Sequence, residues 1–161
     1  MKNMYLSNSE FYNTASPNAI AEIFGNEDNP YLNGVAYFYS SPTSGIYVQV
    51  EVFELPDDNY IDSSGFFGMH IHQYGNCSLP FNQTGEHLNP TNRLHPNHIG
   101  DLPPLLSSHG YAWCVFYDGR LSISDILNKS LIIHNRRDDF TTQPSGDSGT
   151  KIACGIIKAL N

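Results

Sequence analysis

The segment IYVQVEVFE, residues 46–54, alternates between two kinds of side chain. One set of alternate positions is apolar and holds Val48, Val50 and Val52, and the other set holds Tyr, Gln and Glu. A period of two residues is that of a β-strand with one face toward a core and the other toward water. The segment therefore predicts a strand in a sheet with one buried face.

Seven further short runs rich in Val, Ile, Tyr and Phe lie between clusters of turn residues, and they are 19–25, 33–40, 65–74, 110–117, 119–124, 129–134 and 151–158. No run shows a long helical period. Eight short strands predict an all-β sandwich or barrel. The pair Asp118-Gly119 stands between two of these runs, and such a pair is typical of a tight β-hairpin.

Two stretches contain few strand formers, namely 75–109 and 135–150. The first is rich in Gly, Pro, Asn and Ser. An irregular loop of that length inside a compact domain is usually functional. We therefore expect the chemistry of this protein in or beside residues 75–109.

Length and charge narrow the classes of function. The 161 residues suit a single domain. Eight Lys and Arg against sixteen Asp and Glu give a net charge of -8, which argues against nucleic acid and anionic membranes as partners. The apolar runs are too short for a membrane span. The N-terminus lacks a secretory signal, so we expect a cytoplasmic protein, or a secreted or periplasmic one if a signal was removed.

The histidines are not scattered, because six of the seven lie within residues 70–109. His70 and His72 are two residues apart in a strand-like run, so their imidazoles project from one face and can reach a single ion. An exposed polar pair is the alternative for an isolated His-x-His. The neighbouring histidines favour the metal site.

A second set of potential ligands follows at short spacing, and it comprises His87, His95, His98 and Asp101. Three imidazoles and a carboxylate suit a tetrahedral zinc site. His134 stands in a further strand-like run, SLIIH. Imidazole suits copper as well as zinc, so these side chains suffice for two ions with one shared ligand.

These residues resemble the copper/zinc superoxide dismutases, whose fold is an eight-stranded Greek-key β-barrel. The matching pieces occur in family order and are GMHIHQYGNC (68–77), GEHLNPTNRLH (85–95), HIGDL (98–102), LIIHNRRDD (131–139) and GTKIACGII (149–157). The resemblance implies a barrel domain over 18–161 after an N-terminal extension over 1–17. It also implies disproportionation of superoxide to O₂ and H₂O₂.

The resemblance assigns each ligand position. It implies copper ligands at His70, His72, His87 and His134. It implies zinc ligands at His87, His95, His98 and Asp101. His87 would bridge the two metals through its two ring nitrogens. Asp138 matches the family carboxylate that hydrogen-bonds one histidine of each metal, here His70 and His95, and its alternative is a solvated acid.

The three cysteines by count permit one disulfide and one free thiol, and the resemblance also implies which two are paired. Cys77 and Cys154 match the family's intrasubunit disulfide, and the short spacing from His72 to Cys77 is similar to that of the bacterial branch. Cys114 would be a small apolar residue without a disulfide partner. His109 has no family match and is expected in a loop.

The family's active-site Arg is replaced here by Lys151, which leads us to expect slower turnover. As a cation near copper, Lys151 would attract the superoxide anion. The alternative is that Lys151 points to solvent and that Arg136 or Arg137 supplies the charge. A different class of function also stays open, a copper-binding or copper-storage module on the same barrel. The oligomeric state is not indicated, and a homodimer is one assembly left open.

Overall fold

The computed structural model describes residues 16–56 and 64–160. Within these ranges it has nine strands: β1 (Ala19–Gly25), β2 (Asn33–Ser40), β3 (Ile46–Phe53), β4 (Phe66–Phe67), β5 (Met69–His72), β6 (Leu105–Leu106), β7 (Ala112–Asp118), β8 (Ser130–His134) and β9 (Lys151–Ala159). Two single-turn helices complete the regular structure of the described residues, η1 (Asn82–Thr84) and α2 (Ile123–Ile126). None of the described helices has the length and apolar character needed to cross a membrane.

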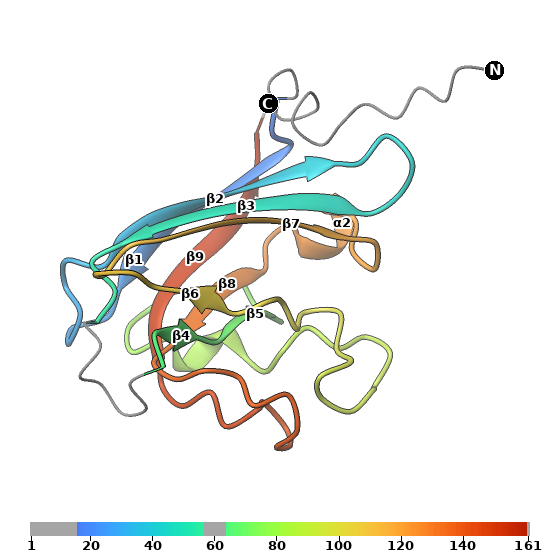
Figure 1. Cartoon of the computed structure of the whole chain (residues 1–161). Helices are drawn as coiled ribbons and strands as arrows, with labels where there is room; N and C mark the ends of the chain where they lie inside the picture. Colours follow the sequence, from blue (N-terminus) through green and yellow to red (C-terminus); the bar gives the residue numbers. More distant parts are fainter. Residues whose placement is uncertain (1–15, 57–63, 161) are drawn as a thin grey trace.

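Seven strands form one curled antiparallel sheet in the order β5-β8-β9-β1-β2-β3-β7, and β4 pairs with β6 in a separate short ribbon (Figure 1). Two neighbouring pairs, β3 with β7 and β9 with β1, are far apart in sequence. The chain therefore crosses between the two ends of the sheet, as in a Greek key. The predicted all-β, barrel-like fold class is confirmed.

The alternation in 46–54 appears in β3 as predicted. Ile46, Val48, Val50 and Val52 are fully buried, while the residues between them are partly exposed. The inner faces of β1, β2, β5, β8 and β9 supply much of the rest of the main core, and the other strands, α2 and the loops add further residues. Strands β5 and β8 are buried along their whole length, because the core covers one face and loops cover the other.

The strand predicted over 119–124 and the hairpin predicted at Asp118-Gly119 are wrong. The Asp118 carboxylate accepts hydrogen bonds from the backbone N–H and the guanidinium of Arg120, which turn the chain away from β7. Ser122 then caps α2 in a capping box with Asp125. Side-chain hydrogen bonds to the backbone thus replace the expected second strand. The run 65–74 forms two strands, β4 and β5, which are separated by Gly68.

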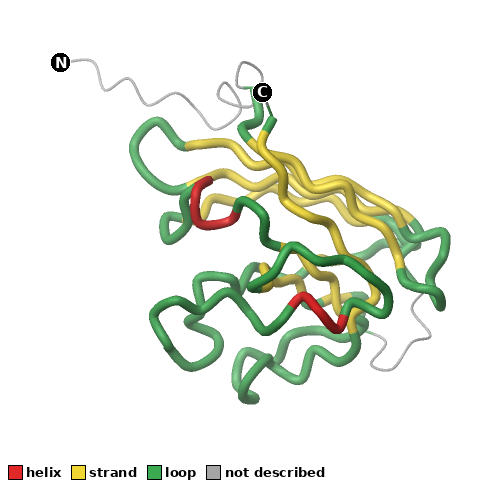
Figure 2. The backbone as a smooth tube through the Cα atoms, turned by 180° about the vertical axis from the view of Figure 1, so that it is seen from behind, coloured by secondary structure: helices red, strands yellow, loops and turns green. Residues whose placement is uncertain are grey.

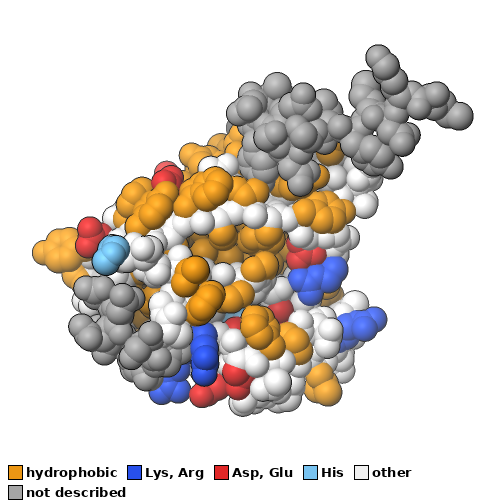
Figure 3. Space-filling view, in the orientation of Figure 1, with side chains coloured by type: hydrophobic (Ala, Val, Ile, Leu, Met, Phe, Trp, Pro, Cys, Tyr) orange, Lys and Arg blue, Asp and Glu red, His pale blue; other side chains and the backbone are white. Residues whose placement is uncertain are grey.

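The two irregular stretches lie side by side beneath the sheet, at the ends of β5 and β8 (Figures 1 and 2). Their contact includes hydrogen bonds between Gln143 and the backbone of His95. On the face shown in Figure 3, the Lys and Arg side chains lie over the half of the molecule that these loops form. Of the predicted N-terminal extension, residues 1–15 lie outside the described residues.

Candidate metal centre

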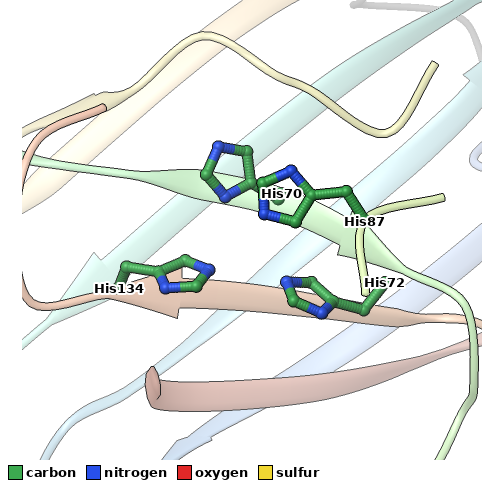
Figure 4. A group of neighbouring side chains, drawn as sticks. All are labelled: His70, His72, His87 and His134. Carbon is green, nitrogen blue, oxygen red and sulfur yellow. The ribbon is translucent and has the colours of Figure 1, made fainter. Parts of the chain in front are cut away.

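Four histidines meet at the lower end of the sheet. His70 and His72 project from β5, His134 projects from the end of β8, and His87 projects from the loop between β5 and β6 (Figure 4). Met69 and Ile71, which alternate with the β5 histidines, belong to the core. His87 is placed by a bridge to His72 and by its neighbour Leu88, whose N–H donates to Ile71 O at 2.7 Å. Because Met69 and Ile71 face the core, the alternation along β5 places both of its imidazoles on the opposite face, which the loops cover.

One nitrogen of each of these rings is left without a hydrogen-bond partner although it is buried. The atoms are His70 Nδ1, His72 Nε2, His87 Nε2 and His134 Nε2. Buried polar atoms are normally hydrogen-bonded, so a convergent set of unpaired nitrogens needs an explanation. The ligand atoms of the four residues lie within 4.8 Å of one another. Four nitrogen donors at this spacing fit a metal ion that prefers imidazole.

The opposite nitrogens of three rings are held by oxygen atoms. His70 Nε2 donates to Asp138 Oδ2 at 2.8 Å. His72 Nδ1 donates to the Gly85 carbonyl at 2.9 Å, and His134 Nδ1 donates to the Gly149 carbonyl at 3.2 Å. Oxygen atoms of this kind only accept, so each bond fixes which nitrogen carries the proton. The remaining nitrogen of each ring is a free electron-pair donor.

The second group shares His87 with the first and adds His95, His98 and Asp101. His87 Nδ1 lies 2.7 Å from Asp101 Oδ1, and His98 Nδ1 lies 3.2 Å from the same oxygen. His95 Nδ1 lies 3.1 Å from Asp101 Oδ2 without the geometry of a hydrogen bond. Three nitrogens around one carboxylate match the donor set of tetrahedral zinc.

The Asp138 carboxylate links the two groups, because it hydrogen-bonds one histidine of each. Its Oδ2 binds His70 Nε2, and its Oδ1 accepts from His95 Nε2 at 2.9 Å. Asp138 is buried, so the alternative of a solvated acid does not describe it. The loop passes so close that a Cβ at Gly146 would collide with Asp138 Oδ1, and Gly146 has φ +69°. Glycine alone satisfies both requirements without strain.

Burial favours the neutral form of three imidazoles in the metal-free protein, those of His72, His87 and His134. It holds the pKa of His72 well below its ordinary value, and His134 and His87 add to the effect. It likewise lowers the pKa of His134, aided by His70. The pKa of His87 falls to about 4 through burial, although the hydrogen bond to Asp101 opposes the fall. Burial by itself raises the pKa of Asp101, but the hydrogen bond to His87 and the nearby imidazoles outweigh burial, so the pKa of Asp101 lies below its ordinary value.

These lowered pKa values predict an acid-sensitive metal-free protein. Between pH 6.5 and about 4 the unfolded chain protonates His87 while the folded chain does not, so the free energy of unfolding decreases as the pH falls. His87 alone would contribute about 3 kcal/mol over this range at about 1.4 kcal/mol per pKa unit. Urea unfolding of metal-free protein at pH 7.5, 5.5 and 4.5 measures this loss. An unfolding free energy that stays constant from pH 7.5 to 4.5 would contradict the burial of neutral imidazoles.

A cavity of about 470 Å³ opens onto both groups, and His72, His87, His98 and His134 line it together with Lys151. The Lys151 ammonium donates to Thr84 Oγ1 at 2.7 Å and to the carbonyls of Gly85 and Phe81 at 3.3 and 3.4 Å. It therefore does not point to solvent. Burial lowers the pKa of Lys151, and Glu86 opposes this effect.

The two arginines that were the alternatives to Lys151 as the source of the steering charge lie outside the cavity over the histidines. Arg136 pairs with Asp147 at 3.3 Å on the surface. Arg137 lines a different depression, beside Asp138 and Phe140. Neither residue lines the cavity over the histidines.

The predicted disulfide between Cys77 and Cys154 is present, with the two Cα atoms 5.7 Å apart. It packs with Phe81, Ile132 and Ile156 in a small second core. Cys114 is free, as predicted, and burial raises the pKa of its thiol to about 11. His109 is an exposed loop residue outside both histidine groups.

Comparison with known protein families shows to which family the chain belongs. Residues 32–157 match the family model described as copper/zinc superoxide dismutase. The chain belongs to the copper/zinc superoxide dismutase family. The resemblance noted from the histidine motifs is thereby confirmed, and the family as a whole implies copper and zinc for the two donor sets.

Relatives in this family include enzymes and other proteins. The chain is 31% identical over 152 residues to "Superoxide dismutase [Cu-Zn]" of Deinococcus radiodurans, and the match covers 81% of this chain and 79% of the relative. It is 33% identical over 106 residues to "Copper chaperone for superoxide dismutase" of Mus musculus, covering 58% and 39%. A solved double mutant of a superoxide-dismutase-like protein from Bacillus subtilis superposes with a TM-score of 0.74 at 29% identity, covering 88% and 95%.

The structure thus brings together every ligand residue expected from the sequence, while their metal-binding roles stay predictions. Of the groups that orient the ligands, the sequence indicated Asp138 but not the others. The carbonyls of Gly85 and Gly149 hold His72 and His134, and Gln143 holds the backbone of His95. Both glycines stand inside the quoted family motifs, which was the available signal. Gln143 has no such signal, because its partner is 48 residues away.

The double hydrogen bond of Asp138 leads to a prediction about zinc. Asp138→Asn keeps the shape but has one carbonyl oxygen, so one of the two imidazole N–H groups would face an amide NH₂. We expect zinc to be held about ten- to a hundred-fold more weakly, as is usual when such a partner is lost. Zinc retention against a chelator measures the effect. Asp147→Asn, a surface change in the same loop, is the control, and equal retention in both variants would contradict the role of Asp138.

Proposed function

We propose that the protein disproportionates superoxide at a binuclear centre, with the overall balance 2 O₂⁻ + 2 H⁺ → O₂ + H₂O₂. Copper would be held by the four-histidine group and zinc by the second group, with His87 in both. The observation that carries this proposal is the set of four unpaired imidazole nitrogens beneath an open cavity. When bound, copper supplies one-electron redox chemistry and zinc supplies a fixed, redox-inert charge.

The chain's own residues have three tasks in this proposal. Gly85, Gly149 and Asp138 keep the copper-side rings in the tautomer that leaves a nitrogen free. The cavity admits a small anion to that side. His87 is shared, because an imidazole carries two donor atoms that point in opposite directions. Its Nε2 has no protein partner and can hold a proton when it is not a ligand.

A copper-binding or copper-storage module remains the second candidate. The three hydrogen bonds of the Lys151 ammonium favour it, because they satisfy all three of its protons with protein oxygens. The match to a copper chaperone agrees with this alternative. Such a module needs the four imidazoles but no cation for an anionic substrate.

The two candidates differ in turnover. Pulse radiolysis of protein loaded with copper and zinc should show many superoxide ions consumed per copper, at a rate first-order in protein and in superoxide. A storage module would consume about one superoxide per copper and then stop. That stoichiometric result would overturn the enzyme and leave the module.

Lys151 gives a prediction about rate. Lys151→Met removes a positive charge that lines the cavity of a protein with net charge -8. For unit charges about 5 Å apart at an effective dielectric of about 20, the attraction is about 3 kcal/mol before screening. We expect the second-order rate constant to fall about ten-fold and to depend less on ionic strength. Lys151→Arg should hold or raise the rate.

Lys158→Met is the matched control, because it removes the same charge from an exposed position on the same strand, β9. Its rate should equal that of the parent protein. A Lys151→Met variant as fast as the parent at low ionic strength would exclude Lys151 from catalysis.

A further inference from the structure

Arg120 reaches from the sheet to the loop that carries the zinc-group residues. Its Nη1 donates to the His98 carbonyl at 3.0 Å, and its Nη2 donates to the Asp101 carbonyl at 2.8 Å. Both acceptors are main-chain atoms of residues whose side chains point into the second donor group. One guanidinium therefore holds two ligand residues by their backbones.

The same guanidinium is fixed to the sheet. Arg120 Nε donates to Asp118 Oδ1 at 3.1 Å, and Nη2 donates to Asp118 Oδ2 at 2.7 Å. Asp118 is the last residue of β7, it pairs with Ile46 of β3, and its side chain is 7% exposed. The planar fork of arginine allows such a bidentate pair while other N–H groups bind elsewhere.

His95 is held separately. Gln143 Oε1 accepts from the His95 N–H at 3.0 Å, and Gln143 Nε2 donates to the His95 carbonyl at 2.7 Å. Loss of Arg120 would therefore remove the hydrogen bonds to the carbonyls of His98 and Asp101 and leave the backbone of His95 held as before. Of the backbone of 98–101, the hydrogen bonds of Gly100 with Leu88 and Ile71 would remain. This difference makes the two contacts separable by experiment.

We propose that Arg120 is a positioning residue of the zinc half of the centre, which fixes the backbone of His98 and Asp101 before the metal binds. The inference rests on the proposed metal function, since it concerns the same site. Its physical basis is preorganisation, because a loop that is already ordered loses less conformational freedom when it binds its ligand. The Asp118-Gly119-Arg120 turn, which ends β7, thereby serves the metal centre.

The test uses Zn²⁺ alone, in competition with a chelator, on three variants. Arg120→Gln should bind Zn²⁺ about ten-fold more weakly, within the range usual for residues that support a ligand. Arg120→Lys should stay weakened, because one ammonium cannot span both carbonyls and the carboxylate in a fork. Full recovery in Arg120→Lys would reduce the role to charge and overturn the proposed clamp. Arg136→Gln removes the charge of a surface arginine and should bind Zn²⁺ as the parent does.

Loss of Arg120 also leaves the Asp118 carboxylate unpaired, and the double variant Asp118→Asn/Arg120→Gln removes that complication. Weak zinc binding in the double variant supports the clamp. If the double variant bound zinc with parental affinity, the weaker binding of Arg120→Gln would be due to the unpaired Asp118 carboxylate, and the inference would be overturned.

Hydrogen exchange of the metal-free protein gives a readout that needs neither zinc nor activity. In Arg120→Gln the amides of His98 and Asp101 should exchange faster, while the His95 amide, which Gln143 holds, should keep its protection. Unchanged exchange over 98–101 would overturn the inference. A parent protein that fails to bind zinc would overturn the proposed function instead, while the exchange pattern would still decide whether Arg120 orders the loop.

Discussion

His87→Ala should abolish superoxide turnover and weaken the binding of both metals in a single substitution. His87 belongs to both donor groups, with Nε2 among the unpaired nitrogens and Nδ1 beside Asp101. Loss of a residue that only supports a ligand costs about ten- to a hundred-fold in affinity or activity, so loss of a shared ligand should cost more than about a hundred-fold. Metal analysis after equal loading and pulse radiolysis measure the two effects.

His109→Asn is the matched control for this experiment. His109 is exposed and has φ +53°, a conformation that Asn tolerates. The control should retain both metals and the parental rate. If His87→Ala also retained both metals and activity, the binuclear centre would be refuted.

The double variant Cys77→Ser/Cys154→Ala should lose roughly 4 kcal/mol of the free energy of unfolding, in the chain-entropy model for a long closed loop. The cross-link joins residues 77 positions apart and anchors the segment that carries Gly85 to β9. Alanine suits position 154 because Cys154 is fully buried and a serine hydroxyl there would lack a partner. Urea unfolding of the metal-free protein measures the loss.

Reductant provides the internal comparison. It should lower the stability of the parent to that of the double variant and leave the double variant unchanged. Cys114→Ala, which removes the free thiol, should respond to reductant as the parent does. Equal stability of the parent with and without reductant would show that the disulfide does not stabilise the fold.

The strands and the ligands could be predicted because their signals are local. In β3 each second residue faces the core, so the alternation of valines is visible in the sequence itself. His70 and His72 share a face for the same reason. The short spacing of His95, His98 and Asp101 likewise keeps them within reach of one another, and together with the family motifs it indicated both donor groups.

Apart from the bonds of Asp138, which the family motifs indicated, the contacts that hold these ligands in place could not be predicted, because they join distant segments. Gln143 binds the backbone of a residue 48 positions away, and Arg120 binds carbonyls 22 and 19 positions away. No local pattern marks such partners. The incorrect hairpin at Asp118-Gly119 has a different origin, since the hydrogen bonds of Asp118 with Arg120, only two residues away, turn the chain away from a second strand.

In the proposed centre, one chain holds two different metals on either side of His87. Diffraction data collected at the copper and zinc absorption edges, from crystals of protein loaded with both ions, test it most directly. We predict a copper peak among His70 Nδ1, His72 Nε2 and His134 Nε2, and a separate zinc peak among His95, His98 and Asp101, with the His87 ring between them. A single metal position, or a zinc peak away from Asp101, would contradict the claim.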